Sequence, residues 1–205
     1  MDVTVLIRCY EQEQYLFDCT RRLGTNSYVI LDDYPKLGKC ERLNRAIPEV
    51  TTKWVAFNDA DDMSLPARFG WMMDVAKLKN IDTSKVDLFY TDCYMLSKKG
   101  VSYYTAGKFD RERLKRDNYI PFSTIIVRTE VAKKFKFIDV ENKGEDWIWL
   151  NRIAKDHKIQ YIDDLATMIY RNYSYPYGRV PILRKLKRII WQRKVRKVIN
   201  EIISD

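Results

Sequence analysis

Short apolar runs alternate with helix-like segments over the first hundred residues, and this alternation constrains the fold more than any other feature. The apolar runs are Val3–Arg8, Ser27–Asp33, Lys53–Phe57 and Val86–Leu96. The helix-like segments between them span residues 12–23, 40–47 and 66–79. Strands that alternate with helices build parallel βαβ units, in which helices cover both faces of a sheet. The sequence therefore predicts a three-layer α/β/α sandwich around a mostly parallel central sheet.

The second half of the chain is less regular but adds elements to the same unit. We expect a strand over residues 123–128, a helix over 145–157 and one or two strands over 159–171. No internal repeat and no Gly/Ser-rich linker divides the 205 residues. The predicted organisation is one domain over residues 1–178, followed by a basic amphipathic helix or tail over residues 179–205.

Positive charge is concentrated in the C-terminal segment. The chain carries a net charge of +9, and residues 179–205 hold nine Lys or Arg against two acids. Because the rest of the chain is nearly neutral, a nucleic-acid-binding surface is not expected. Residues 180–205 have apolar positions at roughly helical intervals. They are expected to pack one face on the domain, to lie on an anionic membrane surface, or to contact a partner or a further domain.

The cysteines and the histidine exclude two kinds of site. Cys9, Cys19, Cys40 and Cys93 show no CxxC spacing, and His157 is the only histidine. A zinc site or a Cys–His nucleophile is therefore not expected. Scattered thiols suit a reducing compartment, so we expect a cytoplasmic location, with the membrane surface as an alternative through the basic tail.

Carboxylates follow two of the predicted strands. The stretch FNDADDMSLPARF contains Asp59, Asp61 and Asp62 directly after an apolar run, and Asp32 and Asp33 end another run. Ligands of open α/β sheets bind outside the carboxyl ends of the strands. Clustered carboxylates there suit Mg²⁺ or Mn²⁺ with a substrate diphosphate, and the chain has no Gly-rich phosphate loop. The alternative interpretation is a surface turn in which Asp62 or Ser64 caps the next helix.

Six segments, in this order, resemble the family-two glycosyltransferases of the GT-A fold. They are VTVLIRCYEQEQYL, YVILDDYPKLGK, GKCERLNRAI, KWVAFNDADDMSLPARF, KGEDWIWLNRI and YRNYS. The resemblance covers residues 2–175 or thereabouts and implies an enzyme that uses a nucleotide-diphosphate sugar, in most relatives a UDP-sugar. It further implies inversion by single displacement, with transfer of the sugar to an acceptor hydroxyl of a glycan, a lipid-linked or a protein-linked substrate.

The resemblance also implies roles for residues of the donor site. Tyr10 would stack on the base, and Asp33 would hydrogen-bond the uracil. Asp59 would lie near the ribose and the sugar. Contacts to the phosphates or the base would come from Lys39 and Arg171.

Metal binding and base catalysis are assigned in the same way. Asp61, with Asp59, would ligate the Mn²⁺ or Mg²⁺ ion that bridges the diphosphate. Asp146 would be the general base that deprotonates the acceptor, and Glu145 would position it. The helix dipole gives a second interpretation of Glu145 and Asp146, because acids in the first turn stabilise a helix.

Several residues depart from the family pattern. Arg8 stands where a small residue or Thr is common, and Glu11 stands where Asn is common, so either side chain would alter the base or phosphate contacts. Tyr34-Pro35 replaces a Gly-Ser/Thr pair, and Tyr173 replaces His. We include Arg8 among the donor-binding candidates.

Two aromatic residues, Trp147 and Tyr94, are candidates for the acceptor side, because sugars stack on aromatic rings. Packing in the core is the competing interpretation of both. For the chain as a whole, the alternatives are a sugar-nucleotide nucleotidyltransferase and a non-catalytic nucleotide-sugar- or carbohydrate-binding module. The pair Glu145-Asp146 argues against the module, because binding alone needs no base.

Overall fold

The computed structural model describes residues 1–10, 12–25, 27–31, 37–65, 67–140, 144–171 and 191–201. In this part of the chain, eight strands form one sheet in the order β2-β1-β3-β7-β5-β8-β4, with β6 paired to β5. The strands are β1 (Val3–Arg8), β2 (Tyr28–Leu31), β3 (Trp54–Asp59), β4 (Met63–Ser64), β5 (Leu88–Ser97), β6 (Gly100–Tyr104), β7 (Ile126–Arg128) and β8 (Ile159–Arg171). The helices are α1 (Leu16–Thr20), α2 (Lys39–Glu49), α3 (Arg68–Leu78), α4 (Arg111–Arg116), α5 (Thr129–Ala132) and α6 (Glu145–Asp156), and residues 191–201 are also helical.

The sheet is mixed, which corrects the expectation of a mostly parallel one. β1 is parallel to β2 and β3, and β5 is parallel to β8. β7 lies between these groups and is antiparallel to both β3 and β5, while β4 and β6 also pair in antiparallel fashion. An apolar run indicates a strand but not its direction, so the sequence pattern of residues 123–128 could not reveal this reversal.

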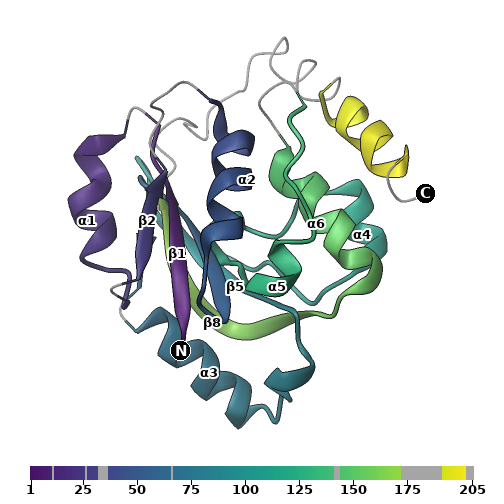
Figure 1. Ribbon diagram of the computed structural model, residues 1–205. Coiled ribbons are helices and arrows are strands. Elements are labelled where there is room, and N and C mark those ends of the chain that lie inside the picture. Colours follow the sequence, from purple (N-terminus) through teal and green to yellow (C-terminus); the bar gives the residue numbers. More distant parts are fainter. Residues whose placement is uncertain are drawn as a thin grey trace.

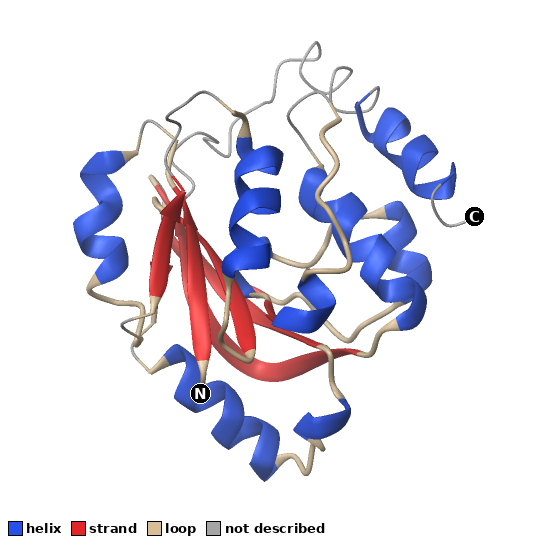
Figure 2. Cartoon of the chain, viewed as in Figure 1, coloured by secondary structure: helices blue, strands red, loops and turns tan. Residues whose placement is uncertain are grey.

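Helices cover both faces of the sheet, as the α/β class predicted (Figures 1 and 2). One core contains Leu43 of α2 and Trp149 of α6, and the core on the other face contains Cys19 of α1 and Met72 of α3. All four cysteines are free and buried. Within the described residues, no helix combines the length and the apolar character that a membrane crossing requires.

Trp149 is the centre of an aromatic cluster in the first core. Its ring stacks on Phe137 with 4.8 Å between centroids, and its indole N–H donates to the backbone oxygen of Phe135 at 2.9 Å. Trp149 is fully buried. We expect Trp149→Ala to lower the free energy of unfolding by about 3–5 kcal/mol, because it leaves a large cavity.

Urea denaturation of this variant measures the loss, and Trp71→Ala is the matched control. Trp71 is 44% exposed on α3, so its replacement is expected to change the stability by no more than about 0.5 kcal/mol. Equal losses for the two variants would contradict the assigned core.

The helix over residues 191–201 packs against the start of α6. Its Val195 and Ile199 are buried in the core that α6 forms. Gly144 precedes α6 with a φ of 73°, and a Cβ at that position would lie 3.0 Å from side-chain atoms of Trp191 and Val195. This helix therefore presents one apolar face to the domain. The rest of the expected basic segment, residues 179–190 and 202–205, lies outside the described residues, and its membrane or partner contact stays a prediction.

Candidate active site

The carboxyl ends of β1 and β3 bring the first candidate residues together. The two strands are parallel neighbours, and Arg8 at the end of β1 is in register with Asp59 at the end of β3. Arg8 donates from Nε and Nη2 to the two carboxylate oxygens of Asp59, the second contact at 2.7 Å. Its Nη1 donates to Oε1 of Glu145, the first residue of α6, at 3.2 Å. The ends of two strands and the start of a helix thus meet at one guanidinium group.

Glu145 is held by two cations. Besides the contact with Arg8, its Oε1 lies 2.8 Å from Nζ of Lys39, the first residue of α2. The Glu145 residue is only 3% exposed, so its charge is balanced inside the protein rather than by water. This arrangement suits a residue that fixes the start of α6 and thereby the position of the next residue, Asp146.

Asp146 is partly exposed at the first turn of α6. Its Oδ1 accepts from the backbone N–H of Trp147 at 2.8 Å, and its Oδ2 accepts from the amide of Asn118 at 3.1 Å. Burial and the neighbouring charge of Glu145 raise the pKa of Asp146 above its usual range. A carboxylate with a raised pKa is a stronger base, which is the property that a general base needs.

The other two acids of the FNDADDMS stretch differ from Asp59. Asp62 is buried, and its carboxylate accepts from the hydroxyl of Ser123 at 2.8 Å and from the backbone N–H of Arg171 at 3.3 Å. Asp61 is partly exposed and forms no salt bridge with the residues that the structure describes. Burial and the charge of Asp59 raise the pKa of Asp61. Burial, with the charges of Asp59 and Asp61, raises the pKa of Asp62 still more clearly.

Two residues of the site were not predicted. Ser123 connects two of the acids, because its hydroxyl accepts from the backbone N–H of Asp59 at 3.3 Å and donates to Asp62. Asn118 contacts Asp146. Both lie in the segment between α4 and β7. Ser123 begins the run 123–128 that the sequence predicts as a strand, but neither residue belongs to a motif that marks it as part of the site.

Three donor-site candidates remain: Arg171, Tyr10 and Asp33. Arg171, at the end of β8, places its guanidinium over the ring of Tyr15 and 3.6 Å from Asp18. Tyr10 is 55% exposed, so its ring is available for stacking. Asp33 lies outside the described residues. The donor roles of these three side chains stay predictions.

Trp147 does not belong to an exposed acceptor surface, which corrects that expectation. It is 1% exposed, and its indole N–H donates to the backbone oxygen of Leu114. The reason is its place on the inner stripe of α6, where it packs in the core. Tyr94 is partly exposed on β5 and forms an edge-to-face pair with Tyr103 of β6, so its acceptor role stays a prediction.

The residues of the site fit a divalent metal only in part. Within the described residues, no three His, Cys, Asp or Glu side chains converge on one point as metal ligands. Both oxygens of Asp59 accept from Arg8, and Asp62 is buried. Asp61 accepts from the Gln12 side chain but is partly exposed, so it is the carboxylate that can turn to a cation. Mg²⁺ is commonly held by one or two carboxylates together with substrate phosphates. One carboxylate, with a bound diphosphate, matches that chemistry.

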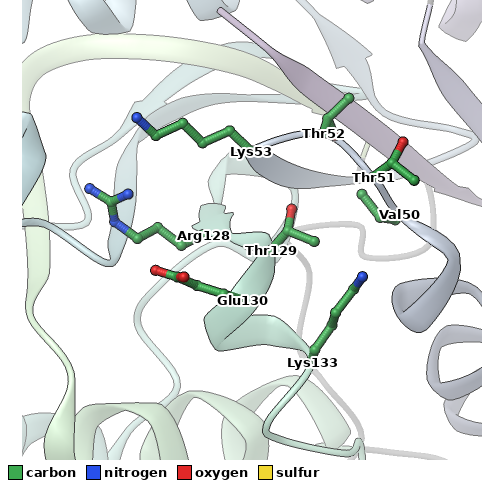
Figure 3. A pocket seen from close by; sticks show the side chains of 8 residues that line it. All are labelled: Val50, Thr51, Thr52, Lys53, Arg128, Thr129, Glu130 and Lys133. Carbon is green, nitrogen blue, oxygen red and sulfur yellow. The ribbon is translucent and has the colours of Figure 1, made fainter.

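A surface pocket of about 480 Å³ lies at the opposite end of β3 and contains none of the candidate residues. Figure 3 shows that the ammonium groups of Lys53 and Lys133 on its wall point in different directions. Arg128 is bonded to backbone oxygens in residues 83–86, so it ties loops together at this end of the sheet. The pocket is therefore not part of the candidate active site.

Two solved structures share this fold. S. aureus TarS in complex with UDP-GlcNAc matches 99% of this chain and 70% of that chain, with a TM-score of 0.66 and 14% identity. Glucosyl-3-phosphoglycerate synthase from Mycobacterium tuberculosis, in complex with Mn²⁺, UDP and glucosyl-3-phosphoglycerate, matches 99% of this chain and 80% of that chain, with a TM-score of 0.60 and 13% identity. The GT-A-like α/β fold class predicted from the sequence is thus confirmed.

The sequence comparisons define the family. A profile described as "Glycosyltransferase like family 2" matches residues 1–180, so the chain belongs to this family. An uncharacterized glycosyltransferase of Methanocaldococcus jannaschii is 22% identical over 144 residues, which are 66% of this chain and 48% of that protein. The chain therefore spans about half the length of this curated relative.

Proposed function

We propose that this chain catalyses the transfer of a sugar from a nucleotide-diphosphate sugar, with UDP as the nucleotide, to an acceptor hydroxyl. The observation that supports this function most directly is the set of hydrogen bonds from Arg8. They connect Asp59, in the carboxylate motif at the end of β3, to Glu145 of the Glu145-Asp146 pair at the start of α6. UDP-GlcNAc bound to TarS and UDP bound to the mycobacterial synthase support the choice of donor.

The proposed reaction is a single displacement with inversion. The acceptor oxygen attacks the anomeric carbon of the donor sugar while the bond from that carbon to the diphosphate oxygen breaks. Asp146 accepts the proton of the acceptor hydroxyl, and UDP leaves with the bonding electron pair. Glu145, fixed by Arg8 and Lys39, holds the helix turn that carries Asp146.

A divalent metal fits the leaving-group side of this reaction. Asp61 would hold Mg²⁺ or Mn²⁺, which supplies positive charge to the departing diphosphate when it is bound. The mycobacterial synthase was crystallised with Mn²⁺ and with Mg²⁺, which supports the same ions here. Arg171 would add a fixed positive charge near the diphosphate.

A panel of nucleotide sugars tests this function without knowledge of the acceptor. Slow hydrolysis of the donor is expected to release UDP from one or more UDP-sugars in Mg²⁺ or Mn²⁺, and EDTA is expected to suppress it. Thermal melting with the same panel reports binding independently, because a ligand of the folded state raises the melting temperature. A chain that neither binds nor hydrolyses any member of the panel would rule out the proposal.

A further inference from the structure

Arg8 is the cation about which the acids of the site are arranged. It contacts Asp59 through two hydrogen bonds and Glu145 through a third. Its guanidinium also lies over the ring of Phe122, 4.4 Å from the centroid. The Arg8 side chain is 15% exposed, so packing and paired charges fix its position. It is therefore a constant component of the site rather than a mobile surface side chain.

The charge balance shows what Arg8 does for its surroundings. Asp59, Asp61, Asp62 and Glu145 are four carboxylates close to the ends of β1 and β3, and Asp146 adjoins them. Within the part of the chain that the structure describes, Arg8 and Lys39 are the two cations that form ion pairs with these carboxylates. Without Arg8, Asp59 would keep no cation among those residues, and Glu145 would keep only Lys39. An incoming diphosphate would then meet a more negative site, even with the charge of Arg171 that acts on Asp61.

We propose that Arg8 is a resident cation of the donor site, which allows a nucleoside diphosphate to bind before a divalent metal is present. This inference rests on the proposed function and deepens it. In this role Arg8 is a positioning and charge-balancing residue, and the metal serves the departure of the leaving group rather than the binding of the nucleotide. Asp59 would remain paired with Arg8, and Asp61 would take the metal.

The proposal predicts opposite changes for two ligands when the charge of Arg8 is removed. In Arg8→Gln, the site gains net negative charge, and Asp59 is released as an additional carboxylate. Metal-free binding of UDP is expected to weaken by about tenfold or more, because the anion meets more repulsion. Binding of Mn²⁺ without nucleotide is expected to tighten several-fold for the same reason. A variant that was merely distorted would lose affinity for both.

Two titrations measure these effects on the whole chain. Isothermal titration calorimetry with UDP in EDTA gives metal-free nucleotide binding, and electron paramagnetic resonance of free Mn²⁺ gives metal binding without nucleotide. Arg8→Lys keeps the charge and is expected to retain most of the metal-free UDP affinity. Arg45→Gln is the matched control, since Arg45 forms an exposed pair with Glu41 on α2. It is expected to bind both ligands as the unmodified chain does.

The unmodified chain alone already tests the idea, even if Arg8→Gln fails to fold. It is expected to bind UDP in EDTA with an affinity within about tenfold of that in Mn²⁺. Binding of UDP only in the presence of metal would overturn the resident-cation role while leaving the proposed function intact. Unchanged UDP affinity in a folded Arg8→Gln variant, or parallel loss of UDP and Mn²⁺, would also overturn it. If UDP binds neither in EDTA nor in Mn²⁺, the result would instead count against the proposed function.

Discussion

Replacing Asp146 by Asn is expected to lower the rate of sugar transfer by about 10²–10⁴-fold, while UDP binding stays unchanged. Asn keeps the shape of the side chain and can still accept from the backbone N–H of Trp147, so the start of α6 is preserved. It cannot accept the proton of the acceptor hydroxyl. The loss is expected in kcat, because the carboxylate acts in the transition state. Steady-state kinetics with a saturating UDP-sugar and calorimetric titration with UDP measure the two quantities.

The pH dependence follows from the same residue. As the proposed general base, Asp146 must be deprotonated for transfer, and burial with the charge of Glu145 raises its pKa. Activity is therefore expected to fall with decreasing pH at a value above the usual carboxyl range, which centres at about 4.

The matched control for Asp146→Asn is Asp110→Asn, the same change at the N-cap of α4, which should leave transfer unaltered. Undiminished transfer by Asp146→Asn would remove Asp146 as the base.

Replacing Asp61 by Ala is expected to lower metal-dependent UDP formation by about 10²-fold or more, because the metal would lose its proposed protein ligand. Asp62 cannot substitute, since its carboxylate is buried and accepts from Ser123 and the backbone of Arg171. Asp59 is bonded to Arg8. The variant is expected to fold normally, because removing a carboxylate whose pKa is raised by burial relieves an unfavourable charge.

Initial rates over a range of Mn²⁺ concentrations measure this effect. Asp61→Ala is expected to need far more Mn²⁺ for any residual rate. Asp74→Ala, which removes an exposed carboxylate from α3, is expected to match the unmodified chain. If both variants respond to Mn²⁺ equally, Asp61 is not the metal ligand.

The elements that the sequence predicted well are those with a strong periodic pattern. The apolar runs that became β1, β3 and β5 and the stripe of α6 all have the expected type. β4 spans two residues and α4 is a charged turn with Leu114 as its one buried residue, so neither carries a pattern that distinguishes it from a loop. The direction of β7 depends on the path of the whole chain, which no local window contains.

Prediction of the candidate site from the sequence has the same limit, because a local pattern does not contain contacts between distant parts of the chain. The position of Asp59 at a strand end and of Asp146 at a helix start follows from local pattern and from the family motifs. The contact between Arg8 and Glu145 joins residues 137 positions apart, and only the tertiary fold reveals it. Its residue type makes Trp147 a candidate for stacking on sugars, whereas its position on the buried face of α6 places it in the core.

We propose that this chain breaks the bond between a sugar and a nucleoside diphosphate with help from a divalent metal. A ³¹P NMR time course on a UDP-sugar chosen from the panel follows that bond directly. With Mg²⁺, the resonances of the UDP-sugar are expected to give way to those of UDP. Addition of EDTA should stop the change, and Asp61→Ala should show almost none. Conversion at the same rate in EDTA, or none with any UDP-sugar that the chain binds, would contradict the account.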